Sequence, residues 1–129
     1  MSESIFTKII KGEIPSYKIY EDENHFAFFD IGPFARGHTL VIPKKEYDNI
    51  SDMPEDEYVD LQKVVLKLVK HYRKVLDCKI GTLVFGLDVP HVHIHVFPIT
   101  HELGVFDFSK VNKYLDGEAE SFMNRLKLN

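Results

Sequence analysis

The stretch HVHIHVFP, residues 91–98, restricts the fold of this chain more than any other. Its first, third and fifth positions are histidines, and the positions between the histidines are β-branched. Successive side chains of a strand point to opposite faces, so this spacing predicts a strand over 91–98. One face would be aliphatic and suited to a core. The other would present a row of imidazoles, formed by His91, His93 and His95.

The size and composition of the chain are ordinary for a soluble globular protein. With 129 residues, 44% hydrophobic and 28% charged, we expect one domain over 1–129, with a core over about 4–100 and a C-terminal extension over 101–129. The net charge is −4 and no stretch is densely basic, so neither nucleic acid nor a membrane surface is an expected partner. No signal peptide or membrane span is evident, and we expect a cytoplasmic protein. A single cysteine, Cys78, excludes an internal disulfide and a multi-cysteine metal site.

Hydrophobic periodicity and turn residues divide the chain into helices and strands. Strands are predicted over 17–22, 25–31, 38–44, 80–86 and 91–98. Helices are predicted over 4–11, with Ser4 as N-cap, and over about 54–76, 109–115 and 118–128. Short connections between strands favour an α+β fold, namely a five-stranded antiparallel meander with a long helix, a short N-terminal helix and a helical C-terminal tail.

The histidine row has three interpretations. A structural role is unattractive, because each buried imidazole needs a partner and three neighbouring cations would repel one another at low pH. A metal site is limited by geometry, since alternate residues of a strand are roughly 6.6 Å apart and a third ligand, such as His38, would be required. The third interpretation is nucleophilic catalysis at phosphorus, with His93 attacking between two flanking donors, His91 and His95.

The row resembles the signature of the histidine triad (HIT) superfamily, in its branch of histidine triad nucleotide-binding proteins. The segments IFTKIIKGEIP, FFDI and GHTLVIPKK also match, in family order, so the resemblance runs from about Ile5 to Pro98. It implies a HIT-like fold that pairs into a homodimer. It also implies a nucleotide hydrolase or nucleotidyl transferase that acts at the α-phosphate of nucleotide conjugates, of the purine phosphoramidate or dinucleoside polyphosphate type. A nucleotide-binding regulatory module with little or no hydrolysis is the alternative.

The resemblance also assigns roles to residues. His93 would be the nucleophile, with His91 supporting it, His95 contacting the phosphate and leaving group, and His38 joining them near the same centre. Asp30 matches the acidic residue that holds the ribose hydroxyls. The apolar base pocket would be formed by Phe6, Ile9, Phe28 and Ile31. Asp88 and Val89, which lead into the row, are expected beside the substrate.

Two departures from the family pattern affect these expectations. Some members carry a Cys-x-x-Cys pair in the first helix that helps to form a structural zinc site, and this chain has Ser4 and Thr7 there. We therefore expect no metal and no cofactor. The family usually has Gly-Gln-Ser or Gly-Gln-Thr before the triad, and this chain has Gly86-Leu87-Asp88. An ionised Asp88 facing a phosphate would repel it.

Overall fold

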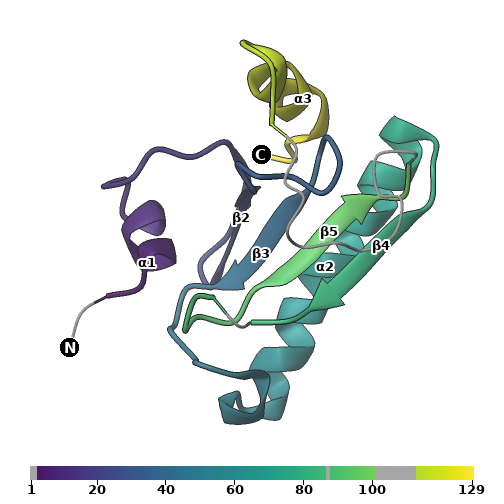
Figure 1. Cartoon of the computed structure of the whole chain (residues 1–129). Coiled ribbons are helices and arrows are strands. Elements are labelled where there is room, and N and C mark those ends of the chain that lie inside the picture. The colour runs from purple at the N-terminus through teal and green to yellow at the C-terminus, as the bar shows by residue number, and fades with distance from the viewer. Residues whose placement is uncertain (1–2, 87, 101–112) are drawn as a thin grey trace.

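The computed structural model describes residues 3–86, 88–100 and 113–129. Its centre is a five-stranded sheet in which every neighbouring pair of strands is antiparallel (Figure 1). The strands are β1 (Lys18–Glu21), β2 (His25–Phe29), β3 (Thr39–Pro43), β4 (Ile80–Val84) and β5 (Ile94–Pro98). The predicted α+β class and its antiparallel five-stranded sheet are confirmed.

The helices of the described chain are α1 (Ile5–Ile10), η1 (Ile50–Asp52), α2 (Glu55–Leu76) and α3 (Glu118–Leu126). Ser4 caps α1 as predicted, because its side chain accepts a hydrogen bond from the Thr7 backbone N–H. The helix predicted over 109–115 is wrong for residues 113–115, which are not helical, while 109–112 lie outside the described residues. Leu115 there is 70% exposed and has no core to pack against. No helix in the described ranges is long and apolar enough to cross a bilayer.

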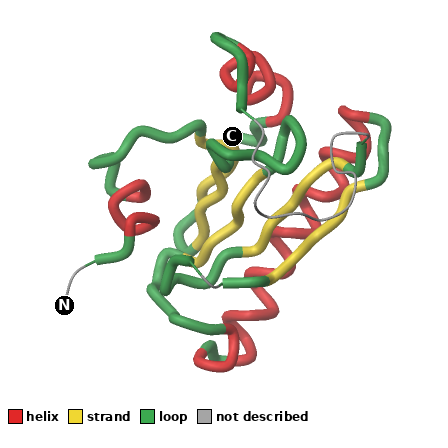
Figure 2. Tube along the Cα trace, viewed as in Figure 1, coloured by secondary structure: helices red, strands yellow, loops and turns green. Residues whose placement is uncertain are grey.

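The two faces of the sheet bury different apolar clusters. The face towards α2, which runs along the sheet in Figure 2, forms the larger cluster. It includes Val41, Val92, Ile94 and Val96 together with Leu61, Leu68 and Tyr72 of α2. The face towards α1 forms a smaller cluster of Phe6, Phe26, Phe28, Leu40 and Ile42. Because side chains alternate along β5, the aliphatic residues face α2 and the histidines lie on the α1 side.

The order of the strands departs from the predicted meander. It is β1-β2-β3-β5-β4, so β5 lies between β3 and β4. Burial explains this order, since β5 is almost fully buried and belongs in the centre, whereas β4 is partly exposed and suits an edge. The predicted strand over 91–98 also begins only at Ile94. Before it, the Val92 N–H donates to the Tyr47 carbonyl (2.8 Å), which is in the loop after β3 rather than in a neighbouring strand.

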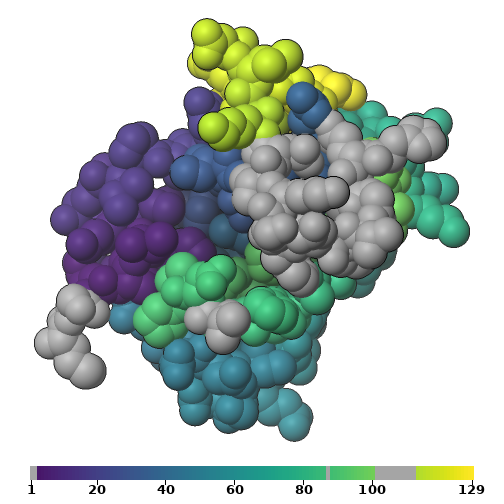
Figure 3. All heavy atoms as spheres, in the orientation of Figure 1, coloured from purple at the N-terminus to yellow at the C-terminus, as the bar shows by residue number. Residues whose placement is uncertain are grey.

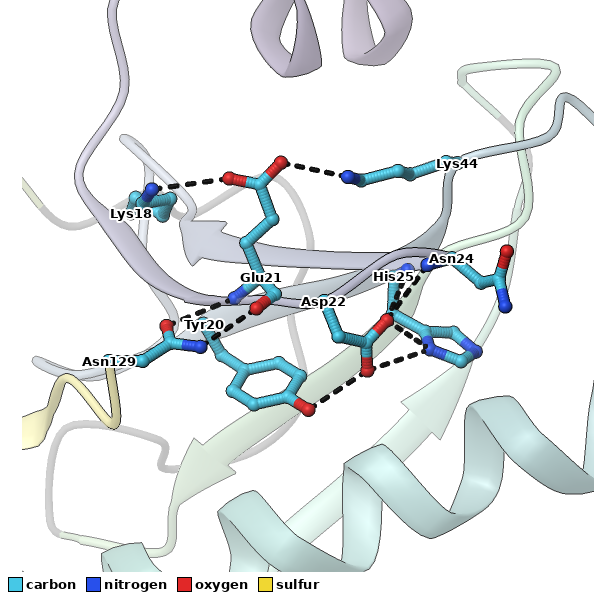
Figure 4. Close-up of polar contacts among 8 residues, drawn as sticks. All are labelled: Lys18, Tyr20, Glu21, Asp22, Asn24, His25, Lys44 and Asn129. Carbon is cyan, nitrogen blue, oxygen red and sulfur yellow. Dashed lines mark hydrogen bonds and ion pairs between the residues drawn. The ribbon is translucent and has the colours of Figure 1, made fainter.

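The C-terminal residues lie along the outer edge of β1. The Leu128 N–H donates to the Ile19 carbonyl (2.9 Å). The Asn129 side chain accepts from the Glu21 N–H (3.2 Å) and donates to the Glu21 carbonyl (2.7 Å), as Figure 4 shows. In the adjoining turn, the Asp22 carboxylate accepts from the His25 N–H (2.8 Å) and so starts β2. The tail thus satisfies backbone groups that an edge strand would otherwise leave unpaired.

Candidate active site

A cavity of about 590 Å³ opens on the α1 side of the sheet. It lies between α1, the end of β2 and the connection from β4 to β5, and Figure 3 shows the purple N-terminal segment beside the green connection on this face. Most of the residues predicted for the site line it, namely Phe6, Ile9, Phe28, Asp30, Ile31, Asp88, Val89, His93 and His95. The other two, His91 and His38, do not line the cavity and contact its histidines from behind.

His93 presents an unprotonated nitrogen. Its Nδ1 lies 2.8 Å from the carbonyl oxygen of His91. A carbonyl can only accept, so Nδ1 carries the proton and Nε2 bears the lone pair of the neutral ring. The ring is 6% exposed and packs edge-on against Phe6, with 5.1 Å between ring centroids. The backbone and Phe6 therefore hold one tautomer in one orientation at the cavity wall.

His91 is fully buried and bonded at both ring nitrogens. Its Nε2 donates to the Pro43 carbonyl (2.7 Å), so its Nδ1 is the acceptor for the Ser4 hydroxyl (2.7 Å). Burial lowers the pKa of His91, and the carbonyl of Pro43 and the charge of Glu46 oppose this shift. The His91 ring is thus neutral and held in place by both of its hydrogen bonds. The backbone carbonyl of the same residue is the group that orients His93.

The N-terminus of α1 is held against His91 by a small polar cluster. The Ser4 hydroxyl donates to His91 and also accepts from the Thr7 N–H (3.1 Å). The Glu46 carboxylate accepts from the Thr7 hydroxyl (2.6 Å) and from the Ser4 backbone N–H. These hydrogen bonds lower the pKa of Glu46 and keep it ionised. Because α1 carries Phe6, which packs on the His93 ring, the cluster fixes the position of this part of the cavity wall beside His93.

His38 and His95 share one hydrogen bond. The Phe34 N–H donates to His38 Nδ1 (2.9 Å), so His38 Nε2 carries the proton that is donated to His95 Nδ1 (2.8 Å). The neutral His95 ring therefore has its own proton on Nε2. Burial, which disfavours the charged form, is the main cause that lowers the pKa of His38 to about 3 and that of His95 to about 4. Phe34 stacks on both rings, at 4.3 Å and 5.5 Å between centroids.

Asp30 contributes a carboxylate to the cavity wall. Its Oδ1 accepts from the Gly32 N–H (2.8 Å), and burial raises the pKa of the carboxyl. Its ligand atom lies within 4.8 Å of those of His38 and His95, which are residue types that bind metals. However, these two imidazoles already face each other across a 2.8 Å hydrogen bond, so their lone pairs do not converge on a common ion. The geometry fits a hydrogen-bonded pair better than a metal centre.

Sequence reasoning missed two residues that support the site. Phe34 follows Gly32-Pro33 in a loop, and its aromatic character was the only local signal for stacking on histidine. Glu46 lies in a run of charged residues after β3, and its contact with Ser4 spans 42 positions in the sequence. No local pattern identifies a partner at that distance.

Comparison with known proteins matches the model of the HIT domain to residues 11–102. This chain belongs to the HIT domain family. An uncharacterised HIT-like protein of Methanocaldococcus jannaschii is 44% identical over an alignment of 99 positions that covers 73% of this chain and 77% of that protein. An adenosine 5'-monophosphoramidase of Candida albicans is 37% identical over an alignment of 130 positions, gaps included, that covers 84% of this chain and 84% of that protein.

Solved structures of HIT proteins agree with this assignment. A HIT-like protein from Bartonella henselae, described as involved in cell-cycle regulation, has a TM-score of 0.82 at 32% sequence identity. The superposition covers 97% of this chain and 95% of the Bartonella chain. A zinc-bound histidine triad family protein from Mycobacterium smegmatis has a TM-score of 0.78 at 28% identity, covering 95% and 91%. The fold around the four histidines is therefore the HIT fold.

Proposed function

We propose that this HIT protein is a nucleotide hydrolase or nucleotidyl transferase that acts at the α-phosphate of nucleotide conjugates through a covalent nucleotidyl-histidine on His93. The observation that carries the proposal is the tautomer of His93. Its Nδ1–H is bonded to the His91 carbonyl, which leaves the Nε2 lone pair for attack. As the ring becomes positively charged in the intermediate, the same carbonyl stabilises it.

His95 is the proposed proton donor to the leaving group. The free site keeps its pKa at about 4, so the ring is neutral near pH 7. A bound phosphate anion would raise that pKa, because an opposite charge stabilises the imidazolium. With His95 protonated in this complex, His93 Nε2 forms a bond to phosphorus while the P–N bond breaks, and the His95 imidazolium gives one proton to the departing amine and becomes neutral. In the second half-reaction, water attacks phosphorus and gives a proton back to His95, and the P–N bond to His93 breaks.

The cavity suits a nucleoside monophosphoryl group. Phe6, Ile9, Phe28 and Ile31 provide an apolar wall for a purine base. Asp30 on the same cavity has a raised pKa and a carboxylate able to accept from two vicinal ribose hydroxyls. Relatives named adenosine 5'-monophosphoramidases, from Candida albicans and from Saccharomyces cerevisiae, favour phosphoramidase activity on an adenine nucleotide.

The test is turnover of adenosine 5'-phosphoramidate by the wild type, His93→Ala and a matched control, His71→Ala, which changes a histidine of α2. We expect the wild type and the control to release AMP and His93→Ala to lose at least 10³-fold in kcat/KM, as loss of a covalent nucleophile requires. Acid quenching in a single turnover should trap AMP on the wild type only. Equal rates for the wild type and His93→Ala would refute the catalytic proposal.

A nucleotide-binding regulatory module is the second candidate. Asp88 favours it, because a carboxylate stands in the cavity wall where a phosphate is expected. This candidate predicts that calorimetry detects AMP binding while single-turnover quenching detects no nucleotidyl-His93. Detection of the covalent intermediate would exclude it.

We also propose that the protein forms a homodimer along β4. This strand lies at an edge of the sheet, and the described chain places no further strand beside it. Large apolar side chains are exposed on β4 and α2, namely Val84 (38%), Val59 (44%) and Leu66 (52%). Pairing of two β4 edges would satisfy their backbone groups and cover these side chains.

A further inference from the structure

Asp88 contributes a carboxylate to the wall of the cavity. It lies in the connection from β4 to β5 and lines the same cavity as His93 and His95. Asp88 is exposed, in contrast to Asp30, which is half-buried and accepts a hydrogen bond from the Gly32 N–H. A carboxylate in this position would attract a cationic leaving group and repel an anionic one.

The cavity has no compensating cation among its described lining residues. Those residues include two carboxylates, Asp30 and Asp88, and neither a lysine nor an arginine. His95 in the free site is neutral near pH 7 because its pKa is about 4. A site for a polyphosphate is ordinarily rich in Lys or Arg, because each added phosphate brings further negative charge. This wall is better suited to a substrate with a single phosphoryl charge.

An aromatic residue of the same connection as Asp88 favours a cationic leaving group. Phe85 also lines the cavity and is 53% exposed. An aromatic face and a carboxylate are the two groups that attract an alkylammonium ion, by cation–π contact and by charge. Both belong to the segment that leads into the histidines, whereas the apolar base wall comes from α1 and β2. The two walls thus divide the substrate into a nucleoside part and an amine part.

We infer that Asp88 is a specificity-determining residue that selects leaving groups by charge. It favours phosphoramidates whose amine carries a positively charged group at its far end, and it disfavours anionic leaving groups such as polyphosphates. This inference rests on the proposed function and specifies its substrate class. At a separation of several ångströms near the surface, one unit of leaving-group charge should change kcat/KM by about three- to fivefold.

The experiment uses three adenosine 5'-phosphoramidates that differ only in the end of the amine: propylamine (neutral), 1,3-diaminopropane (cationic) and β-alanine (anionic). Rates are measured for the wild type, for Asp88→Asn, and for Asp60→Asn as a matched charge change on the exposed face of α2. The wild type and Asp60→Asn should prefer the cationic over the anionic compound by about tenfold or more. Asp88→Asn should reduce this preference to about twofold or less.

A preference that is the same in the wild type and Asp88→Asn would overturn the inference, as would an equal effect of Asp60→Asn. To separate this result from failure of the proposed function, the same three compounds are titrated by calorimetry into His93→Ala and into His93→Ala/Asp88→Asn. If the wild type turns over none of the compounds, the proposed function fails. The ratio of Kd values in the two variants then still decides whether Asp88 discriminates charge.

Discussion

Replacement of Ser4 by alanine should destabilise the fold and loosen the active site, because one hydroxyl has two roles. As the N-cap of α1 it accepts from the Thr7 N–H, and loss of such a cap costs about 1 kcal/mol. It also donates to Nδ1 of the buried His91, and leaving a buried acceptor unpaired costs about 1–3 kcal/mol. We therefore expect Ser4→Ala to lower the free energy of unfolding by about 2–4 kcal/mol.

Urea denaturation measures this change, with Ser51→Ala as the matched control. Ser51 is an exposed serine of η1, and its replacement should change the unfolding free energy by less than about 0.5 kcal/mol. Ser4→Thr, which keeps the hydroxyl, should recover most of the loss. Because α1 carries Phe6 and Ile9 to the cavity, Ser4→Ala should also raise KM for the nucleotide. If Ser4→Ala and Ser51→Ala are equally stable, the proposed support of His91 by α1 is refuted.

Three further predictions concern pH, the C-terminal segment and assembly. The pKa of His38 is about 3 in the fold and 6.5 unperturbed, so the unfolded chain binds more protons between these values, and stability should fall below pH 6.5. The loss from this group is about 2 kcal/mol at pH 5, and urea denaturation of His38→Gln at pH 7 and pH 5 should show a smaller decrease than the wild type. Tyr114→Phe removes the acceptor of the Gly37 N–H (2.9 Å) and should cost about 1 kcal/mol in thermal unfolding; an unchanged Tm would contradict this role. Leu66→Glu places a charge in the proposed dimer interface, so light scattering should change from the mass of two chains to that of one, and a persistent two-chain mass would argue against this interface.

Much of the fold could be predicted from local sequence patterns. The order of the strands in the sheet could not, because it depends on contacts between residues far apart in the sequence. The alternation in 91–98 identified both faces of β5, and the spacing of apolar residues identified α2. The position of β5 inside the sheet was missed, because short connections allow β4 and β5 to pair without deciding which of them lies next to β3. The burial that decides it was present in the composition, since β4 contains Gly81 and Thr82 where β5 is apolar.

In the candidate site, too, some residues could be predicted from the sequence and others could not. Its cavity residues were identified because the resemblance to the HIT family gave them an order along the chain. The role of the C-terminal extension was not predicted, yet Glu118 forms an ion pair with Arg36 (2.5 Å) and Tyr114 binds the backbone just before His38. Leu126 is completely buried. These contacts join segments about 80 positions apart, for which a single sequence gives no signal.

The cover that Leu128 and Asn129 give to β1 makes the two edges of the sheet unequal. Strand addition needs a row of free N–H and C=O groups, and at β1 some of these groups are already bonded to the tail. A chain that can be joined at one edge only can form a closed pair, but it cannot be extended into a filament. Leu128 and Asn129 therefore block the addition of a further strand at β1. Their removal would leave both edges of the sheet open, so that copies of the chain could add at each edge and form a filament.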